Sequence, residues 1–173
     1  MPSIVADDKQ VSTGNSADER SGKYLTFQLG QEEFGIRVLK VREIMGIQEI
    51  TAVPQTPPHV KGVINLRGKV VPVIDLRLKF GLAAADYTQR TCIIVTQVRG
   101  ESGIILMGVI VDGVSEVLTL ASSDIEDTPD FGEETTGNYL LGLAKVKGKV
   151  KILLDIDRVL SAQDLHHLKA LIQ

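Results

Sequence analysis

The chain has very few of the residues from which disulfide-stabilised, metal-binding or membrane-spanning proteins are built. Its 173 residues include one cysteine, three histidines and no tryptophan. Cys92 has no second cysteine to pair with, which is typical of a protein from a reducing compartment. The longest apolar run, GIILMGVIV at residues 103–111, is too short to cross a bilayer. We therefore expect a cytoplasmic protein with no membrane insertion, and the polar N-terminus predicts no signal peptide.

Positive charge and catalytic motifs are scarce as well. The net charge of −3 and the pI of about 5.6 argue against nucleic-acid binding, because phosphate neutralisation requires a clustered positive surface. No phosphate-binding loop, nucleophile elbow or dinucleotide-binding glycine pattern occurs. His59 lies beside prolines, and the neighbours His166 and His167 cannot face each other on a helix, so no metal site is expected.

Three side chains that could carry chemistry have simpler structural interpretations. Asp75 and Asp155 each end a strand-like run, where a carboxylate caps a turn, although paired carboxylates can also catalyse. Cys92 lies in an apolar run, which favours a packed thiol over a nucleophile. The sequence therefore favours an interaction module over an enzyme, with no catalytic residue, metal or cofactor.

Strand-type patterns dominate what is present. Residues 1–22 are polar, small and charged, and predict a disordered tail. From residue 24 to residue 38 two alternating runs predict a hairpin, and a second hairpin is expected over residues 91–111. Residues 39–46 fit either a helical turn or a strand. In KVVPVIDL at residues 69–76 both faces are apolar, and Pro72 predicts a bulge or a sheet edge.

Two blocks of the chain recur in the same order. GVINLRGKVVPVIDLRLKF at residues 62–80 aligns with GLAKVKGKVKILLDIDRVL at residues 142–160, and residues 35–45 align with residues 108–118. This pattern predicts two copies of one β-unit. Four or five short strands per copy cannot shield a flat sheet from water, so each copy is expected to close into a small barrel. The two barrels should pack together, and a helix at residues 161–172 should cap them.

Four blocks resemble the CheW family, the coupling proteins of bacterial chemotaxis. In order, they are YLTFQLGQEEFGIRVLKVREIMG, TPPHVKGVINLRGKVVPVIDLRLKFGL, GVIVDGVSEVL and GNYLLGLAKVKGKVKILLDIDRVL. The resemblance implies an all-β fold of two intertwined, five-stranded SH3-like barrels with a C-terminal helix. Residues 23–173 would form one domain of two pseudo-repeated subdomains. The match along the whole chain favours the stand-alone coupling protein over the homologous regulatory domain of the kinase CheA.

The resemblance also implies a function. The chain would be a non-enzymatic adaptor that couples the cytoplasmic tip of methyl-accepting chemotaxis receptors to the regulatory domain of the histidine kinase CheA. It would be recruited from the cytoplasm to membrane-associated receptor arrays. One alternative is a coupling module for a non-flagellar kinase pathway, such as pilus motility or second-messenger control. Another is an enzyme with a site between the barrels.

The resemblance assigns the receptor-binding residues, namely Val41, Glu43, Ile44, Arg67, Gly68 and Val117. Arginine at the Arg67–Gly68 turn can grip a carboxylate with two hydrogen bonds, which Lys147 in the matching turn cannot. Arg67 could instead be a solvated turn residue, and the three apolar residues could be core residues. For the kinase or ring contact, the resemblance points to Asp130 and Phe131 in the acidic loop, where Phe131 alternatively packs into the core.

Overall fold

The structure, a computed structural model, describes residues 19–100, 103–128, 139–160 and 164. Its strands are β1 (Gly22–Leu29), β2 (Glu32–Arg37), β3 (Val41–Gly46), β4 (Val60–Leu66), β5 (Lys69–Asp75), β6 (Cys92–Gly100), β7 (Gly103–Val111), β8 (Gly113–Leu120), β9 (Ile125–Glu126), β10 (Leu140–Val146) and β11 (Lys149–Leu154). Short helical segments join them: η1 (Val38–Lys40), α3 (Leu76–Lys79), η2 (Ser122–Asp124) and α5 (Ile156–Val159).

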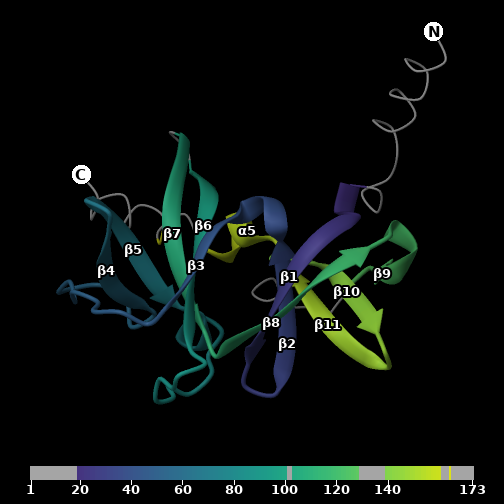
Figure 1. Cartoon of the computed structure of the whole chain (residues 1–173), viewed down its shortest axis with the longest axis horizontal. Helices are drawn as coiled ribbons and strands as arrows, with labels where there is room; N and C mark the ends of the chain where they lie inside the picture. The colour runs from purple at the N-terminus through teal and green to yellow at the C-terminus, as the bar shows by residue number, and fades with distance from the viewer. Residues whose placement is uncertain (1–18, 101–102, 129–138, 161–163, 165–173) are drawn as a thin grey trace, which may run out of the picture.

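The strands form two sheets, which Figure 1 shows on either side of α5. One sheet has the order β3-β6-β7-β5-β4, and the other has the order β8-β1-β2-β11-β10-β9. The pairs β2–β11 and β5–β7 are parallel, and the remaining neighbours are antiparallel. The expected all-β architecture is confirmed, with β9 as a two-residue addition to the second sheet.

Each sheet takes strands from both halves of the chain. The β1–β2 hairpin lies between β8 and β11 of the second half, and the β6–β7 hairpin lies between β3 and β5 of the first half. The two exchanges match in register, since Gly35 pairs with Leu153 and Gly108 pairs with Val73. The expectation that each copy closes on itself is therefore wrong. Each sheet is instead closed by strands of the other copy. These strands form hydrogen bonds with the hairpin edges that a single copy would leave unpaired.

The core has three parts. One apolar cluster fills the first sheet around Ile64, Val73 and Ile93, and another fills the second sheet around Tyr24 and Leu153. The largest cluster lies between the sheets and includes Phe27, Ile94 and Leu154. Strand β1 consequently buries residues of both faces, including Tyr24 and Thr26, which the alternating pattern predicted to be less buried.

The local expectations for the loops and caps are mostly met. Asp75 Oδ1 accepts hydrogen bonds from Arg77 N (2.9 Å) and Leu78 N (3.4 Å), and so caps α3. Asp155 Oδ1 accepts one from Asp157 N at 3.1 Å and caps α5 in the same way. Residues 39–46 contain both a 3-10 turn and a strand.

Pro72 lies in the part of β5 that pairs with β4 alone. The parallel ladder to β7 begins one residue later, at Val73. The expectation of a sheet edge is therefore wrong, because β5 is an inner strand between β7 and β4. Proline is tolerated there because the missing N–H of Pro72 removes no bond to β7. The bulge lies in β4, between Val60 and Gly62, and not at Pro72.

The chain is anchored at both ends of the described part. Arg20 is 8% exposed and donates from Nη1 to Leu141 O at 2.8 Å, so Arg20 of the expected tail packs against β10. Gly22 of the expected tail already belongs to β1 and pairs with Leu120 of β8. Residues 1–18 lie outside the described residues, as does the expected C-terminal helix apart from Asp164. Asp164 is buried between His59 Nε2 (3.0 Å) and Lys79 Nζ (2.8 Å), which ties the chain after α5 to the first half.

Candidate functional site

The two glycine turns have the same backbone conformation. Arg67 and Gly68 have φ values of 51° and 88°, and Lys147 and Gly148 have φ values of 53° and 80°. Positive φ at both central residues is the type I′ geometry that joins two adjacent strands most tightly. Asn65 Oδ1 supports the first turn by accepting a hydrogen bond from Gly68 N at 2.7 Å. The long side chain at the first turn position is thereby held at the end of each hairpin.

Arg67 forms a two-point ion pair with Glu43. Its Nη2 lies 2.6 Å from Glu43 Oε1, and its Nη1 lies 3.2 Å from Glu43 Oε2. The side chain of Arg67 is 71% exposed and that of Glu43 is 32% exposed. β3 and β4 are the two outermost strands of their sheet, so this pair spans the seam where the sheet curls closed.

Each partner stabilises the charged form of the other. The hydrogen bonds that Arg67 donates hold the pKa of Glu43 below its usual value. The same hydrogen bonds, together with the negative charge of Glu43, raise the pKa of Arg67 further above neutrality. The pair is therefore fully ionised at neutral pH. It presents a guanidinium whose fork is held in a fixed orientation.

The predicted apolar residues lie in three different settings. Val41 packs against the apolar cluster between the two sheets, which agrees with the alternative that it is a core residue. Ile44 is 44% exposed and follows Glu43 on β3, where side chains alternate between half-buried and exposed. Val117 is 53% exposed, but it lies on β8 of the other sheet, opposite Leu25. Among the described residues the structure thus brings Glu43 and Arg67 into contact, and no described contact joins Val117 to them.

Other exposed apolar residues were missed by the sequence patterns. Ile104 is 64% exposed and Val70 is 48% exposed, and both line a shallow hollow next to Gly68. Leu39 in η1 is 82% exposed. Periodicity could not reveal Ile104, because its run, GIILMGVIV, is apolar throughout. Asp130 and Phe131 lie outside the described residues.

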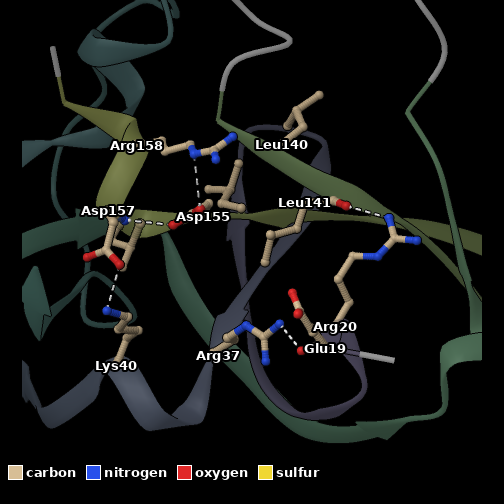
Figure 2. Close-up of a pocket in the computed structure, with 11 residues that line it drawn as sticks. Glu19, Arg20, Arg37, Lys40, Leu140, Leu141, Asp155, Asp157 and Arg158 are labelled. Atoms are coloured by element: carbon tan, nitrogen blue, oxygen red, sulfur yellow. Dashed lines mark hydrogen bonds and ion pairs between the residues drawn. The ribbon is translucent and has the colours of Figure 1, made fainter. Parts of the chain in front are cut away.

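A second hollow, of about 430 Å³, is lined mainly by charged residues (Figure 2). Its basic side chains are engaged by partners on its own walls. Lys40 Nζ is 2.7 Å from Asp157 Oδ2, and Arg158 Nε is 3.5 Å from Asp155 Oδ2. Arg37 donates to the carbonyl oxygen of Glu19. These interactions hold the start of α5 against η1. The residues that line this hollow include no nucleophile with an adjacent base.

The described residues offer little for catalysis. Within them, no group of three or more His, Cys, Asp and Glu side chains could hold a metal ion. Cys92 is half-buried, and its Sγ lies 3.2 Å from the carbonyl oxygen of Arg90. None of the helices in the described part has the length and hydrophobicity needed to span a bilayer. The arrangement is suited to recognition of another protein through a charged pair and neighbouring apolar residues.

Comparison with known proteins identifies the family to which the chain belongs. The family model described as "CheW-like domain" matches residues 23–164. This chain belongs to the CheW family. The chemotaxis protein CheW of Klebsiella aerogenes is 41% identical over 143 residues, which is 83% of this chain and 84% of that protein. The CheW of Bacillus subtilis is 34% identical over 149 residues, 86% of this chain and 93% of that protein.

The fold agrees with that of a solved CheW. The crystal structure of the scaffolding protein TtCheW from Thermoanaerobacter tengcongensis superposes with a TM-score of 0.73 at 32% identity, covering 83% of this chain and 95% of that one. The two sheets are thus the two intertwined SH3-like barrels expected of a CheW fold. A relative with another name, Protein FrzA of Myxococcus xanthus, is 29% identical over 126 residues, 73% of this chain and 76% of that protein.

Proposed function

We propose that this chain is a non-enzymatic adaptor of bacterial chemotaxis that couples chemoreceptors to the histidine kinase CheA. Membership of the CheW family supports this proposal, since relatives that match most of the chain are named chemotaxis protein CheW. The exposed Arg67, its ion pair with Glu43 and the exposed Ile44 also support a surface for recognition of another protein. The adaptor would act in the cytoplasm and be recruited to membrane-associated receptor arrays. The matched strand exchanges support the further proposal that residues 23–173 form two pseudo-repeated subdomains.

The receptor-binding surface is centred on the Arg67–Glu43 pair, and this pair is the observation that carries the proposal. Its guanidinium is exposed and oriented, which suits recognition of a carboxylate on the receptor tip. Because Glu43 already accepts a hydrogen bond from Nη1 and another from Nη2, the receptor carboxylate either displaces Glu43 or binds the remaining N–H groups of Arg67. Gly68, Ile44, Val41 and Val117 would complete the surface around a helical hairpin of the receptor.

The test reverses the charge of the turn residue. Arg67→Glu places two carboxylates together at the seam and should weaken binding of a receptor cytoplasmic fragment by about tenfold or more. Lys147→Glu is the matched control, because it makes the same change in the equivalent turn of the other barrel. Binding is measured by pull-down and calorimetry, and folding by circular dichroism. Equal binding by the Arg67→Glu variant and the wild type would remove Arg67 from the receptor surface.

A second surface would bind the regulatory domain of CheA and neighbouring units of the array. By family resemblance it includes Asp130 and Phe131. Co-purification from cells is the broadest test, because an adaptor should bring down a receptor and a histidine kinase together. Recovery of a kinase without any chemoreceptor would instead support a non-flagellar pathway. The similarity to Protein FrzA, a relative not named CheW, keeps that second candidate in view.

A further inference from the structure

A largely apolar cavity of about 730 Å³ has no role in the receptor and kinase surfaces described above. Its walls come from the β1–β2 turn, the segment after α3, and strands β10 and β11. It therefore lies where the first and second halves of the chain meet. Ligand pockets for small organic molecules have volumes of roughly 300–1,000 Å³ and mostly apolar walls, and this cavity meets both conditions.

One wall of the cavity is a column of aromatic rings. Phe34 and Phe80 stack with centroids 5.8 Å apart, and Phe80 and Tyr139 stack at 5.3 Å with an interplanar angle of 13°. Phe27 continues the column behind Phe34 at 6.0 Å. Four of the seven aromatic residues of the chain thus gather here. Aromatic rings at a cavity wall favour a further flat ring, which can lie edge-to-face or offset-stacked against them.

Two charged residues line the cavity, Glu32 and Arg77, and Arg77 is already neutralised by an ion pair. Arg77 donates from Nε to Asp112 Oδ1 at 2.9 Å and from Nη2 to Asp112 Oδ2 at 3.0 Å. Its Nη1 donates to the carbonyl oxygen of Ala83 at 2.9 Å, and Gly30 N donates to Asp112 Oδ2 at 2.8 Å. This network fixes the rim in place. It also leaves Arg77 a poor partner for an anionic ligand, and the carboxylate of Glu32 would repel one. The largely apolar cavity therefore suits an uncharged molecule better than an anion.

One polar group at the cavity is unsatisfied. Thr128 lines the cavity, and its Oγ1 is buried with no hydrogen-bond partner among the residues that the structure describes. A buried hydroxyl without a partner is unfavourable and calls for an explanation. A ligand with a single hydrogen-bonding group would supply the missing partner.

We propose that this cavity binds a small, planar, uncharged aromatic molecule that carries one hydrogen-bonding group. Its ring packs against Phe80 and Tyr139, and its polar group bonds to Thr128 Oγ1. The adaptor would then hold a small-molecule site between its two halves, separate from the turn that carries Arg67.

The test uses 2-naphthol as the probe and the full chain labelled with ¹⁵N. Titration should shift the amide resonances of Gly30, Leu82 and Tyr139 and leave that of Arg67 unchanged. Leu143→Trp places a large side chain in the cavity and should abolish these shifts while the other resonances stay dispersed. Absence of shifts in the wild type, shifts centred elsewhere, or unchanged binding by a folded Leu143→Trp variant would overturn the proposal.

A second variant tests the hydroxyl without depending on cavity filling. Thr128→Val keeps the shape and should weaken 2-naphthol binding about three- to tenfold, the range of a single neutral hydrogen bond. Binding of naphthalene, which lacks the hydroxyl, should not change, and Thr119→Val on β8 is the control. Equal loss for both probes would overturn the role of Thr128. Tighter 2-naphthol binding by Phe131→Ser would mean that the chain itself occupies the cavity, which also overturns the proposal.

Discussion

Arg67 and Lys147 occupy a turn position whose backbone conformation suits neither of them. Both have φ above 50°, a region that glycine and asparagine accept more readily than residues with long side chains. A hairpin selected for stability alone would carry Asn-Gly at this turn. We infer that the side chain at residue 67 is retained for what it contacts, and that the turn gives up some stability for it.

Replacing the turn residues by asparagine should therefore separate stability from binding. Arg67→Asn and Lys147→Asn should each raise the midpoint of thermal unfolding by about 2–4 °C, since both relieve the same backbone conformation. Only Arg67→Asn should weaken receptor binding. Differential scanning calorimetry and the receptor pull-down measure the two effects. A lower midpoint for both variants would contradict the view that the turns are conformationally costly.

The three tyrosines offer a test of residue environments, since Tyr24 is fully buried, Tyr139 is half-buried and Tyr87 is 39% exposed. Burial raises the pKa of Tyr24 and of Tyr139. Burial, followed by the charge of Asp75 and a hydrogen bond to it, raises the pKa of Tyr87 to about 12. The folded chain thus holds the phenol protons more tightly than the unfolded chain, whose tyrosines titrate near 10.0.

The consequence is a loss of stability in alkali. The stabilisation from these phenols is fully present below pH 10, and it is lost as the pH rises toward 12. Absorbance at 295 nm should show tyrosinate appearing later in the native chain than in denaturant, with no tryptophan to interfere. Tyr87→Phe should remove the latest part of the native titration. A native curve that coincides with the denatured one would show that the rings are accessible to water.

At the scale of elements, β4 and β10 share a bulge that only glycine accommodates. Each strand shifts register at its glycine, Gly62 or Gly142, where a short neighbouring segment crosses closely. A Cβ on Gly62 would lie 2.0 Å from the carbonyl oxygen of Thr51, and a Cβ on Gly142 would lie 2.8 Å from that of Glu126. Backbone atoms cannot move aside as a flexible side chain can, so the first clash is the more severe.

Alanine substitutions should follow this order. Gly62→Ala should lower the free energy of unfolding by about 3–4 kcal/mol and Gly142→Ala by about 2 kcal/mol. Gly148→Ala has no atom within 4 Å of the new Cβ and should cost only about 1 kcal/mol, from its positive φ. Urea unfolding of the three variants measures the order. A larger loss for Gly148→Ala than for Gly62→Ala would contradict the close-approach argument.

Elements were the scale at which the sequence was most informative. The alternation of Leu25, Phe27 and Leu29 located β1, and Arg67–Gly68 located a two-residue hairpin turn, because period and turn chemistry are local properties. The partner of each strand is a long-range property, and an apolar run such as GIILMGVIV does not specify it. The Arg67–Glu43 contact was hidden for the same reason. The two residues are 24 positions apart, on strands that meet only when the sheet closes.

At the scale of the whole molecule, the strand exchange makes the two halves interdependent. The β6–β7 hairpin has β3 on one side and β5 on the other, and both come from the first half. The β1–β2 hairpin depends in the same way on β8 and β11 of the second half. A half alone would keep its local hairpins, but its β1–β2 or β6–β7 hairpin would lose the ladders on both edges. It would also expose the cluster between the sheets, to which both halves contribute.

Separating the chain in the loop before β6 should therefore abolish folding of both pieces. Fragments 1–85 and 86–173, each alone, should give poorly dispersed NMR spectra and no cooperative thermal transition, because each lacks two of the five main strands of one barrel and three of the five of the other. Mixed in equal amounts, they should recover the spectrum of the intact chain, since the cut severs only one connection. The NMR spectrum and thermal transition of each fragment, measured before and after mixing, distinguish strand exchange between the two copies from barrels that each close within one copy. If each barrel instead closed from its own copy, at least one fragment would fold and unfold cooperatively by itself, and mixing would change neither spectrum.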